Sequence, residues 1–205
     1  MSWKRMAASV TLALAAMISG SHAGEVTGIR AEYLKSIADV EQKVVSLAEA
    51  TPQKRFTWRP MKGVRSVSEV FMHVAGSNYI LPTFAGVKPS ARITPELEKS
   101  VTDKAKVIET LKASFAHLRD AITNTPDADL DNRVQTPQGE MSVRELYLAT
   151  VIHGHEHLGQ MIAYARVNHI TPPWTAAEEA KARAMKEEKK SGDKKEGEAK
   201  EGAAK

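Results

Sequence analysis

The chain has 205 residues, no cysteine and a formal net charge of +4. The lack of cysteine excludes disulfides, a thiol nucleophile and a lipid-modified cysteine. The first 23 residues carry a charge of +2, and residues 176–205 carry nine basic against eight acidic side chains, which leaves +1 for residues 24–175. The sequence therefore lacks the basic surface typical of nucleic-acid binding, and no nucleic-acid partner is expected.

The first 23 residues have the three-part pattern of a secretory signal peptide. The basic start MSWKR precedes the apolar run MAASVTLALAAMI, and small residues follow at Ser21 and Ala23. This run of 13 residues is too short to span a bilayer, which takes about 20. We expect cleavage after Ala23, and a mature protein without a membrane span that is exported, periplasmic or secreted.

The next segments predict the first two of four amphipathic helices. Apolar residues recur at helical spacing over residues 27–49, which predicts the first helix. Ser66 and Glu69 have the Ser-x-x-Glu spacing of a capping box, which predicts the start of the second helix. Proline cannot continue a helix, so the second helix should stop at Pro82.

Two further helices complete the predicted fold. The third begins near residue 95 or residue 103 and ends near residue 123, and a hairpin-like segment is expected within residues 124–140. Ser142 and Glu145 repeat the capping box at the start of the fourth helix, which runs to about residue 167. The pattern predicts an all-α four-helix bundle with at least one long connection, in a single domain of residues 24–175.

Residues 176–205 form a charged tail of low complexity. The segment consists mostly of Lys, Glu, Ala and Gly, and it has too little apolar surface to offset the loss of chain entropy on folding. We expect a solvated helix in its first part and disorder from Ser191 onward.

The fourth helix carries the residues that indicate a function. The run TVIHGHEHLGQ contains three histidines in five positions. His153 and His157 are four residues apart and share one helix face, where two imidazoles can hold one cation. His155 is two residues from each and points elsewhere. The predicted inward stripe of this helix is Leu146, Thr150, His153, His157, Gln160, Tyr164 and Val167.

A third ligand is expected from a neighbouring helix, and His73 is the best candidate because it lies within an apolar stripe of the second helix. A three-histidine site leaves coordination positions open for water or substrate. The alternative is that His73 is an ordinary hydrogen-bonded core residue. An inward-facing pair is harder to explain in that way, because two unpaired imidazoles are costly to bury. His117 is expected to be exposed, and neither it nor His169 is expected to bind metal.

Other motifs are excluded. The zinc-protease helix requires His-Glu-x-x-His, but the run that starts at His155 and Glu156 has Gly159 in its fifth position. Glu156 could orient an imidazole, or it could be a solvated residue. The sequence has no Gly-rich phosphate loop and no Gly-x-Ser-x-Gly elbow.

Three stretches together resemble the DinB-like family: WRPMKGVRSVSEVFMHVAGSNY, HGHEHLGQM and ITPPW. The family pattern has a histidine late in the second helix, then His-x-x-x-His and a Gly-Gln pair in the last helix. The matching residues are His73, His153, His157, Gly159 and Gln160. The resemblance spans residues 27–175. It departs from the family at position 158, where a leucine stands in place of the arginine of many members.

The resemblance implies a four-helix bundle with a three-histidine site for a divalent metal ion, and a possible homodimer. Neutral imidazole is itself a good ligand for zinc, nickel or iron. It also implies metal-dependent transfer or isomerisation with low-molecular-weight thiols, although many members have no known activity, so fold alone does not fix the reaction. We expect a thiol-linked transferase or a hydrolase acting on a small molecule, with Gln160, Asn78 and Tyr79 as substrate-binding residues. The alternative is a non-catalytic metal-binding or ligand-binding protein of the cell envelope. A plain bundle without metal remains if the histidines lie apart.

Overall fold

The computed structural model describes the backbone of residues 26–202 and the side chains of residues 26–190. The predicted signal peptide and its cleavage site lie outside the described residues. None of the helices in the described part of the chain has the length and apolar character needed to span a bilayer.

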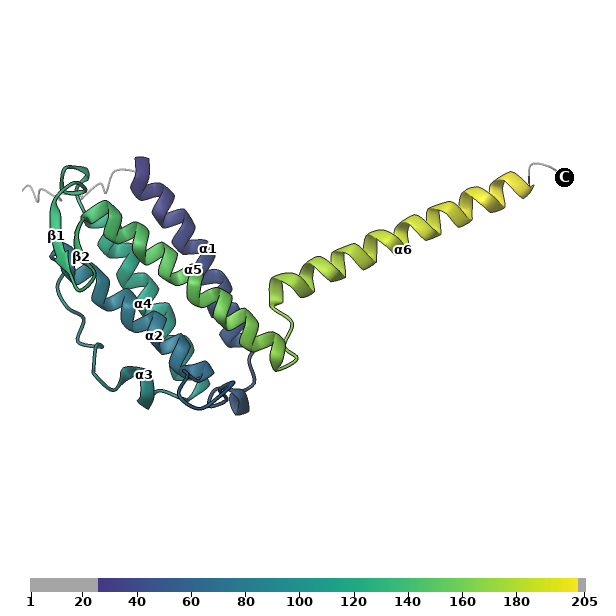
Figure 1. The fold of residues 1–205 in the computed structure, drawn as a ribbon. Coiled ribbons are helices and arrows are strands. Elements are labelled where there is room, and N and C mark those ends of the chain that lie inside the picture. The colour runs from purple at the N-terminus through teal and green to yellow at the C-terminus, as the bar shows by residue number, and fades with distance from the viewer. Residues whose placement is uncertain (1–25, 203–205) are drawn as a thin grey trace, which may run out of the picture.

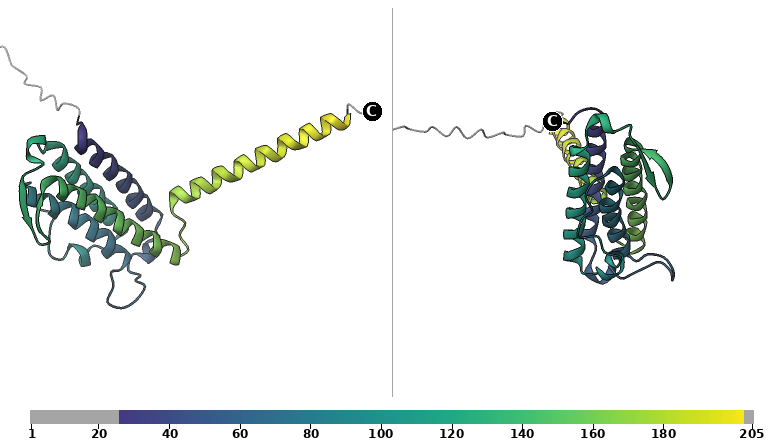
Figure 2. Two further views of the ribbon diagram at one scale, coloured as in Figure 1. Left: turned by 45° about the horizontal axis from the view of Figure 1, so that its top comes forward. Right: turned by 90° about the vertical axis from the view of Figure 1, so that its left-hand side faces the viewer.

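Four long helices form the bundle: α1 (Gly28–Ala50), α2 (Val67–Ile80), α4 (Lys104–Asn124) and α5 (Val143–Val167). Figure 1 shows them packed side by side, and Figure 2 shows the bundle from two further directions. Both α1 and α2 pack against α4 and α5, so α1 and α2 lie on one diagonal of the bundle. The predicted helical bundle is thereby confirmed, and the helix boundaries agree within two residues at most ends.

The chain direction explains the long connection after α2. Arg30 near the start of α1 bonds to Asp127 beyond the end of α4, so these two helices run in opposite directions. Tyr79 at the end of α2 contacts His117 near the end of α4, so α2 and α4 run in the same direction. The link between them must therefore return along the bundle. It contains the 3-10 turn η2 (Leu81–Ala85) and the short helix α3 (Leu97–Ser100).

The connection from α4 to α5 is compact. It consists of a 3-10 turn η3 (Asp127–Asp129) and an antiparallel hairpin of β1 (Arg133–Thr136) and β2 (Gly139–Ser142). The hairpin-like segment expected between residues 124 and 140 is confirmed, and it extends two residues further. It delivers the chain directly to the start of α5 at the same end of the bundle where α4 finishes.

The starts of α2 and α5 are built in the same way. In each helix a serine hydroxyl accepts the backbone N–H three residues later, and the glutamate there accepts the serine N–H, which completes both predicted capping boxes. The first two helical N–H groups donate to carbonyls of the preceding segment, to Trp58 and Phe56 for α2 and to Asn132 and Leu130 for α5. In α2 and α5 the N–H groups of the first turn are therefore paired, which fixes where these two helices begin.

The core lies between the four helices. A tyrosine on α5 and a phenylalanine on each of α2 and α4 are almost completely buried, together with aliphatic side chains from all four helices. The packing is close where α5 crosses α1, because a Cβ added to Gly154 would lie 3.1 Å from Val40 Cγ1. The largest buried side chains are Tyr79, Tyr147, Phe56, Phe71, Phe115, Ile37, Leu47, Met72, Leu111, Leu118, Ile122 and Leu146.

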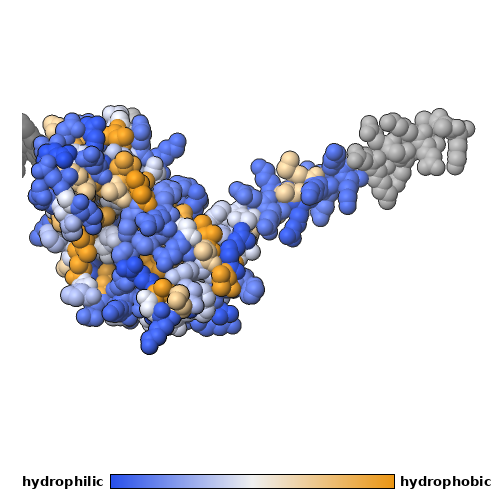
Figure 3. Space-filling view, in the orientation of Figure 1, coloured by the Kyte–Doolittle hydropathy of each residue, from blue (hydrophilic) through white to orange (hydrophobic). Residues whose placement is uncertain are grey.

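The C-terminal segment differs from its prediction. It forms a single helix, α6 (Pro173–Gly202), that projects away from the bundle (Figure 1), so the structure has helix where disorder was expected from Ser191 onward. Ala, Lys and Glu are strong helix formers, which favours helix even without a packing partner. Residues 176–190 are exposed, and the coloured part of this helix is mostly hydrophilic in Figure 3, in contrast to the mixed surface of the bundle.

Candidate metal centre

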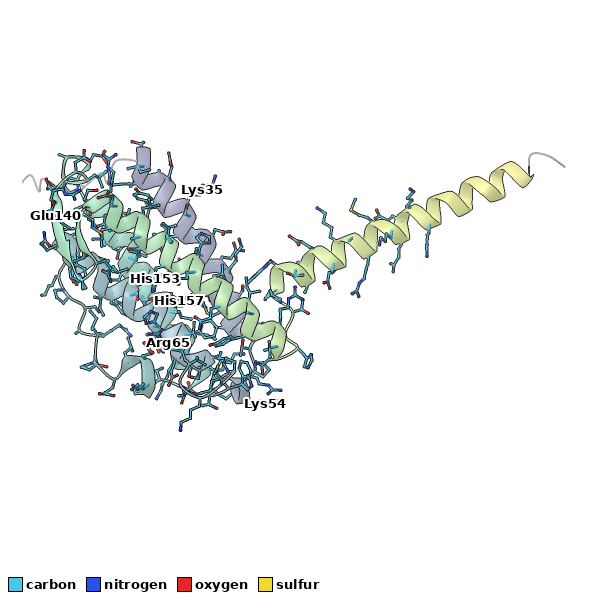
Figure 4. The ribbon with its side chains drawn as sticks, in the orientation of Figure 1. Lys35, Lys54, Arg65, Glu140, His153 and His157 are labelled. Atoms are coloured by element: carbon cyan, nitrogen blue, oxygen red, sulfur yellow. The ribbon has the colours of Figure 1, made fainter. Side chains whose placement is uncertain are left out.

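The structure brings the three predicted histidines together. His73 on α2 and His153 on α5 have their Nε2 atoms 3.2 Å apart. The ring of His157 lies 4.7 Å from that of His73 and 4.5 Å from that of His153, measured between centroids. One ligand atom from each residue lies within 4.8 Å of the others. Figure 4 shows His153 and His157 one turn apart along α5.

The cluster lies at the margin of the core. His73, His153, His157 and Gln160 are half-buried, because the buried stripe of α5 runs beside them. The predicted inward stripe was therefore placed too far toward one side, and its last member, Val167, is 64% exposed. The marginal position gives the cluster access to solvent. The buried residues of α5 are Val143, Leu146, Tyr147, Thr150, Val151, Gly154, Leu158, Met161 and Ala165.

A chain of hydrogen bonds sets the tautomer of His157. The backbone carbonyl of Arg65 can only accept, so the Tyr164 hydroxyl must donate to it, at 3.2 Å. The Tyr164 oxygen in turn accepts from Gln160 Nε2 at 3.1 Å, and Gln160 Oε1 accepts from His157 Nδ1 at 2.8 Å. The proton of a neutral His157 is therefore on Nδ1, and the lone pair of Nε2 is left for another partner.

A second chain begins at the side chain of the same arginine. Arg65 Nε donates to Glu98 Oε1 at 2.7 Å, and the other carboxylate oxygen, Oε2, accepts from His73 Nδ1 at 3.1 Å. His73 therefore also carries its proton on Nδ1 and presents Nε2 toward His153. Both hydrogen-bond chains therefore begin at Arg65. Its carbonyl is linked through Tyr164 and Gln160 to His157, and its guanidinium is linked through Glu98 to His73.

The electrostatic surroundings of His73 and His153 favour their neutral imidazoles. Burial is the main cause that lowers the pKa of His73, with contributions from Arg65 and His157, and Glu98 acts in the opposite direction. Burial, followed by the neighbouring His157, His73 and Arg65, lowers the pKa of His153 to about 4. A neutral imidazole has the free lone pair that a metal ion requires.

These residues fit a divalent metal ion. Three nitrogens bound to one zinc ion at about 2.0–2.1 Å in tetrahedral geometry would lie roughly 3.3 Å apart. The Nε2 atoms of His73 and His153 are 3.2 Å apart, and the whole set lies within 4.8 Å. Imidazole nitrogen suits zinc, nickel and iron. In such sites a histidine ligand commonly donates its other ring nitrogen to a carboxylate or amide oxygen, as His73 and His157 do here.

A cleft of about 350 Å³ adjoins the cluster. His73, Glu98 and Ser77 are among the residues that line it. The Ser77 hydroxyl lies 3.4 Å from His153 Nε2, which places a hydrogen-bonding group between the cleft and His153. A molecule in this cleft would therefore lie beside the nitrogen atoms that could hold a metal.

Two of the predicted substrate-binding residues lie elsewhere. Asn78 is buried and donates to the Ser114 hydroxyl of α4 at 3.2 Å. Tyr79 is 1% exposed, and its ring contacts His117. Both side chains face α4, whereas the histidines lie between α2 and α5, so these two residues do not line the histidine cluster. The contact also makes His117 half-buried rather than exposed as expected.

The other histidines in the described part of the chain, His117, His155 and His169, lie outside the cluster. His155 and Glu156 are exposed, as the spacing indicated for His155, and Glu156 is not among the hydrogen-bond partners of the clustered histidines. His169 has a positive φ of 59° at the end of α5, where its N–H bonds to the Arg166 carbonyl. This is a helix-ending conformation, so His169 has a structural role.

Sequence reasoning did not identify Arg65, Glu98 or Ser77. Ser77 follows His73 by four residues, a spacing that places both on one helix face, so this signal was present in the sequence. Glu98 belongs to the link between α2 and α4, where no periodicity indicates which side chain reaches the site. Arg65 acts partly through its backbone, which no residue type reveals.

The fold and the cluster define a four-helix bundle with three histidines between its second and last long helices. The family model described as the DinB superfamily matches residues 36–161, which is more than half of the chain. The chain therefore belongs to the DinB superfamily. No curated protein matches it.

Solved structures share the fold. A DinB-like protein from Bacillus cereus ATCC 10987 is similar over 69% of this chain and 93% of its own, with 15% identity and a TM-score of 0.62. YfiT from Bacillus subtilis, described as a probable metal-dependent hydrolase with an unusual four-helix bundle topology, is similar over 72% of this chain and 93% of its own, with 13% identity and a TM-score of 0.56. A mycothiol-dependent maleylpyruvate isomerase is similar over 66% of this chain and 63% of its own, with 16% identity and a TM-score of 0.52.

Proposed function

We propose that the protein binds one divalent metal ion through His73, His153 and His157 and is a metal-dependent hydrolase of a small molecule. The observation that carries the proposal is the pair of hydrogen-bond chains from Arg65, which holds the Nδ1 atoms of two histidines and leaves their Nε2 atoms for a shared partner. An ordinary core histidine needs one satisfied hydrogen bond, not a common orientation with two others.

The ion would supply Lewis acidity, which would polarise the carbonyl or related bond that is hydrolysed. The residues of the chain would orient the imidazoles, limit access of water and contact the reacting group. Glu98 and Gln160 hold the imidazoles in place, and the half-buried position of the cluster limits water while leaving the cleft as an entrance. The Ser77 hydroxyl is placed to donate to, or accept from, the reacting group.

Two proteins of similar fold are described as a probable metal-dependent hydrolase, at 13% identity, and a mycothiol-dependent isomerase, at 16% identity, which agrees with metal-dependent or thiol-dependent chemistry. A thiol-linked transferase uses the same kind of metal site and remains part of the test.

The second candidate function is non-catalytic binding of a metal ion or small ligand. It is favoured by one observation: Glu98 is the only carboxylate among the described residues that line the cleft, and it is already paired with both Arg65 and His73. No free general base is therefore available from the cleft walls.

We also propose that the protein works outside the cytoplasm. The proposal is supported by the basic, apolar and small-residue pattern of residues 1–23.

Elemental analysis of untagged protein tests the metal site. One equivalent of divalent metal is expected in the wild type and a substoichiometric amount in His73→Ala, His153→Ala and His157→Ala. His155→Ala is the matched control, because it removes an exposed imidazole from the same helix and should leave the metal content unchanged. Equal metal in all variants would overturn the proposal.

Activity assays then separate the candidate functions. Metal-loaded and chelator-stripped protein are assayed against a panel of uncharged esters and lactones and against thiol adducts. Hydrolysis that requires the metal supports the hydrolase, and metal-dependent thiol transfer replaces it with the transferase. Stoichiometric metal without turnover leaves the binding protein, and hydrolysis that survives in stripped protein contradicts the metal mechanism.

A further inference from the structure

The cleft beside the histidines has mostly apolar walls. One wall is α2, which contributes Met72 and Ile80, and the other is the link between α2 and α4, which contributes Ile93, Pro95 and Leu97. The volume of about 350 Å³ is at the small end of the range of about 300–1,000 Å³ that ligand pockets occupy. The walls therefore suit a small group that gains by leaving water.

The cleft offers no free charge to a ligand. His73 and Glu98 are the only ionisable residues among those that line it. Glu98 is committed to Arg65 at 2.7 Å and to His73 at 3.1 Å. An anionic group placed there would lie beside a carboxylate and find no cation in the walls to offset the loss of its hydration.

The floor of the cleft depends on a glycine. Gly76 has a helical backbone, and a Cβ added to it would have only Leu97 Cδ2 near it, at 4.0 Å. The absence of a side chain at this position keeps the space between α2 and the link open. One residue further on, Ser77 connects the cleft to His153.

We infer that this cleft binds the uncharged apolar part of the substrate, a short acyl chain or a single ring, with the reacting end beside Ser77 and the histidines. The inference rests on the proposed metal site and adds the class of substrate: small, neutral and apolar, rather than an anionic metabolite or an anionic thiol adduct.

Hydroxamates test this preference without turnover. Each carries a head group that binds metal ions and a tail that can be varied, so zinc-loaded protein is titrated calorimetrically with acetohydroxamate, butyrohydroxamate and hexanohydroxamate. Affinity should rise about fourfold for each added methylene until the cleft is filled. Succinic monohydroxamate, which ends in a carboxylate at the length of butyrohydroxamate, should bind at least about tenfold more weakly than butyrohydroxamate.

Two variants place the effect in this cleft. Gly76→Leu fills the floor, so butyrohydroxamate should bind no better than acetohydroxamate, while Gly76→Ala gains similar helix propensity with only one methyl group and should keep the increase with tail length. Ile80→Lys adds a cation to the α2 wall at the lining residue of α2 that is farthest in sequence from His73, and this side chain is 42% exposed. It should reverse the preference, so that the carboxylate-ended compound binds more tightly than butyrohydroxamate.

The outcomes separate the two proposals. Wild-type protein that takes up none of zinc, nickel or iron refutes the metal site itself. Protein that holds zinc but binds the three alkyl hydroxamates within twofold of one another, or that binds the succinic compound most tightly, overturns the substrate class alone. If Gly76→Leu loses zinc, the response of Ile80→Lys decides: unchanged preference in that variant also overturns the inference.

Discussion

Replacing Gln160 by methionine should weaken metal binding without removing a metal ligand. Methionine keeps the length of the side chain but cannot accept the proton on His157 Nδ1, which Gln160 Oε1 now holds at 2.8 Å. The imidazole would then be free to rotate away from the other two histidines. Tyr164 would still donate to the Arg65 carbonyl, so this last bond of the hydrogen-bond chain is expected to stay in place.

The expected loss of metal affinity follows from the number of histidine hydrogen bonds that are removed. A partner that orients one metal-binding histidine contributes about 10- to 100-fold in metal affinity, which is about 1.4–2.7 kcal/mol. Glu98→Leu should cost a similar amount, because it releases His73 in the same way. The double variant Gln160→Met with Glu98→Leu frees two of the three imidazoles, so its loss should exceed either single loss and reach at least about 100-fold.

Substitution of Arg65 allows the effects of the two hydrogen-bond chains on metal binding to be measured separately. Its carbonyl belongs to the backbone, so Arg65→Met removes the guanidinium that holds Glu98 and leaves the acceptor for Tyr164. This variant should therefore weaken binding through His73 and be largely non-additive with Glu98→Leu, but additive with Gln160→Met.

Competition with a chromophoric zinc chelator at neutral pH measures all of these affinities. His155→Ala serves as the control on the same helix and should match the wild type. Gln160→Glu keeps an acceptor for His157 Nδ1 and adds charge, so it should bind zinc at least as tightly as the wild type. Binding by Gln160→Met within twofold of the wild type would refute the argument that the hydrogen-bond chain orients the ligand.

Three other expectations concern stability and processing. Burial alone would raise the pKa of Glu69, but the hydrogen bonds of the capping box and of Arg59 outweigh it and lower the pKa below 4.5. The folded state then binds fewer protons than the unfolded state, so Glu69 contributes to the free energy of unfolding above about pH 4.5, and this contribution is lost as the pH falls through the folded pKa. In Glu69→Gln the midpoint of urea unfolding should therefore fall less steeply as the pH is lowered. Gly154→Leu should cost about 1–3 kcal/mol in the same assay by crowding Val40, and an unchanged midpoint would contradict the close helix crossing. N-terminal sequencing of exported protein should begin at Gly24, and a retained N-terminus would refute cleavage.

The parts of the fold that sequence could predict are the local ones. Each capping box is a hydrogen-bond exchange within four residues, so Ser66 and Ser142 identified two helix starts directly. The spacing of His153 and His157 fixed their shared face for the same reason. Which face of α5 is most deeply buried is set by its neighbours, and the stripe that ends at Val167 was therefore misplaced.

The parts that could not be predicted depend on contacts between distant segments. Glu98 reaches His73 across 25 residues from a link without periodicity. Asn78 and Tyr79 follow the cluster closely in sequence, but α2 packs against both α4 and α5, and a stripe of apolar residues does not show which neighbour each side chain faces. Few residues beyond Ser191 are apolar, so composition alone had to decide between helix and disorder.

The start of α2 connects the stability of the fold to the site. Arg65 directly precedes the capping serine of α2, so the bonds that fix the first turn also fix the carbonyl and guanidinium that hold His157 and His73. Ser66→Ala should therefore lower the free energy of unfolding by about 1 kcal/mol and also weaken zinc binding. Ser142→Ala removes the equivalent bond from α5, more than ten residues before His153, and should lower stability alone. Equal zinc affinity in the two variants would show that the site does not depend on the first turn of α2.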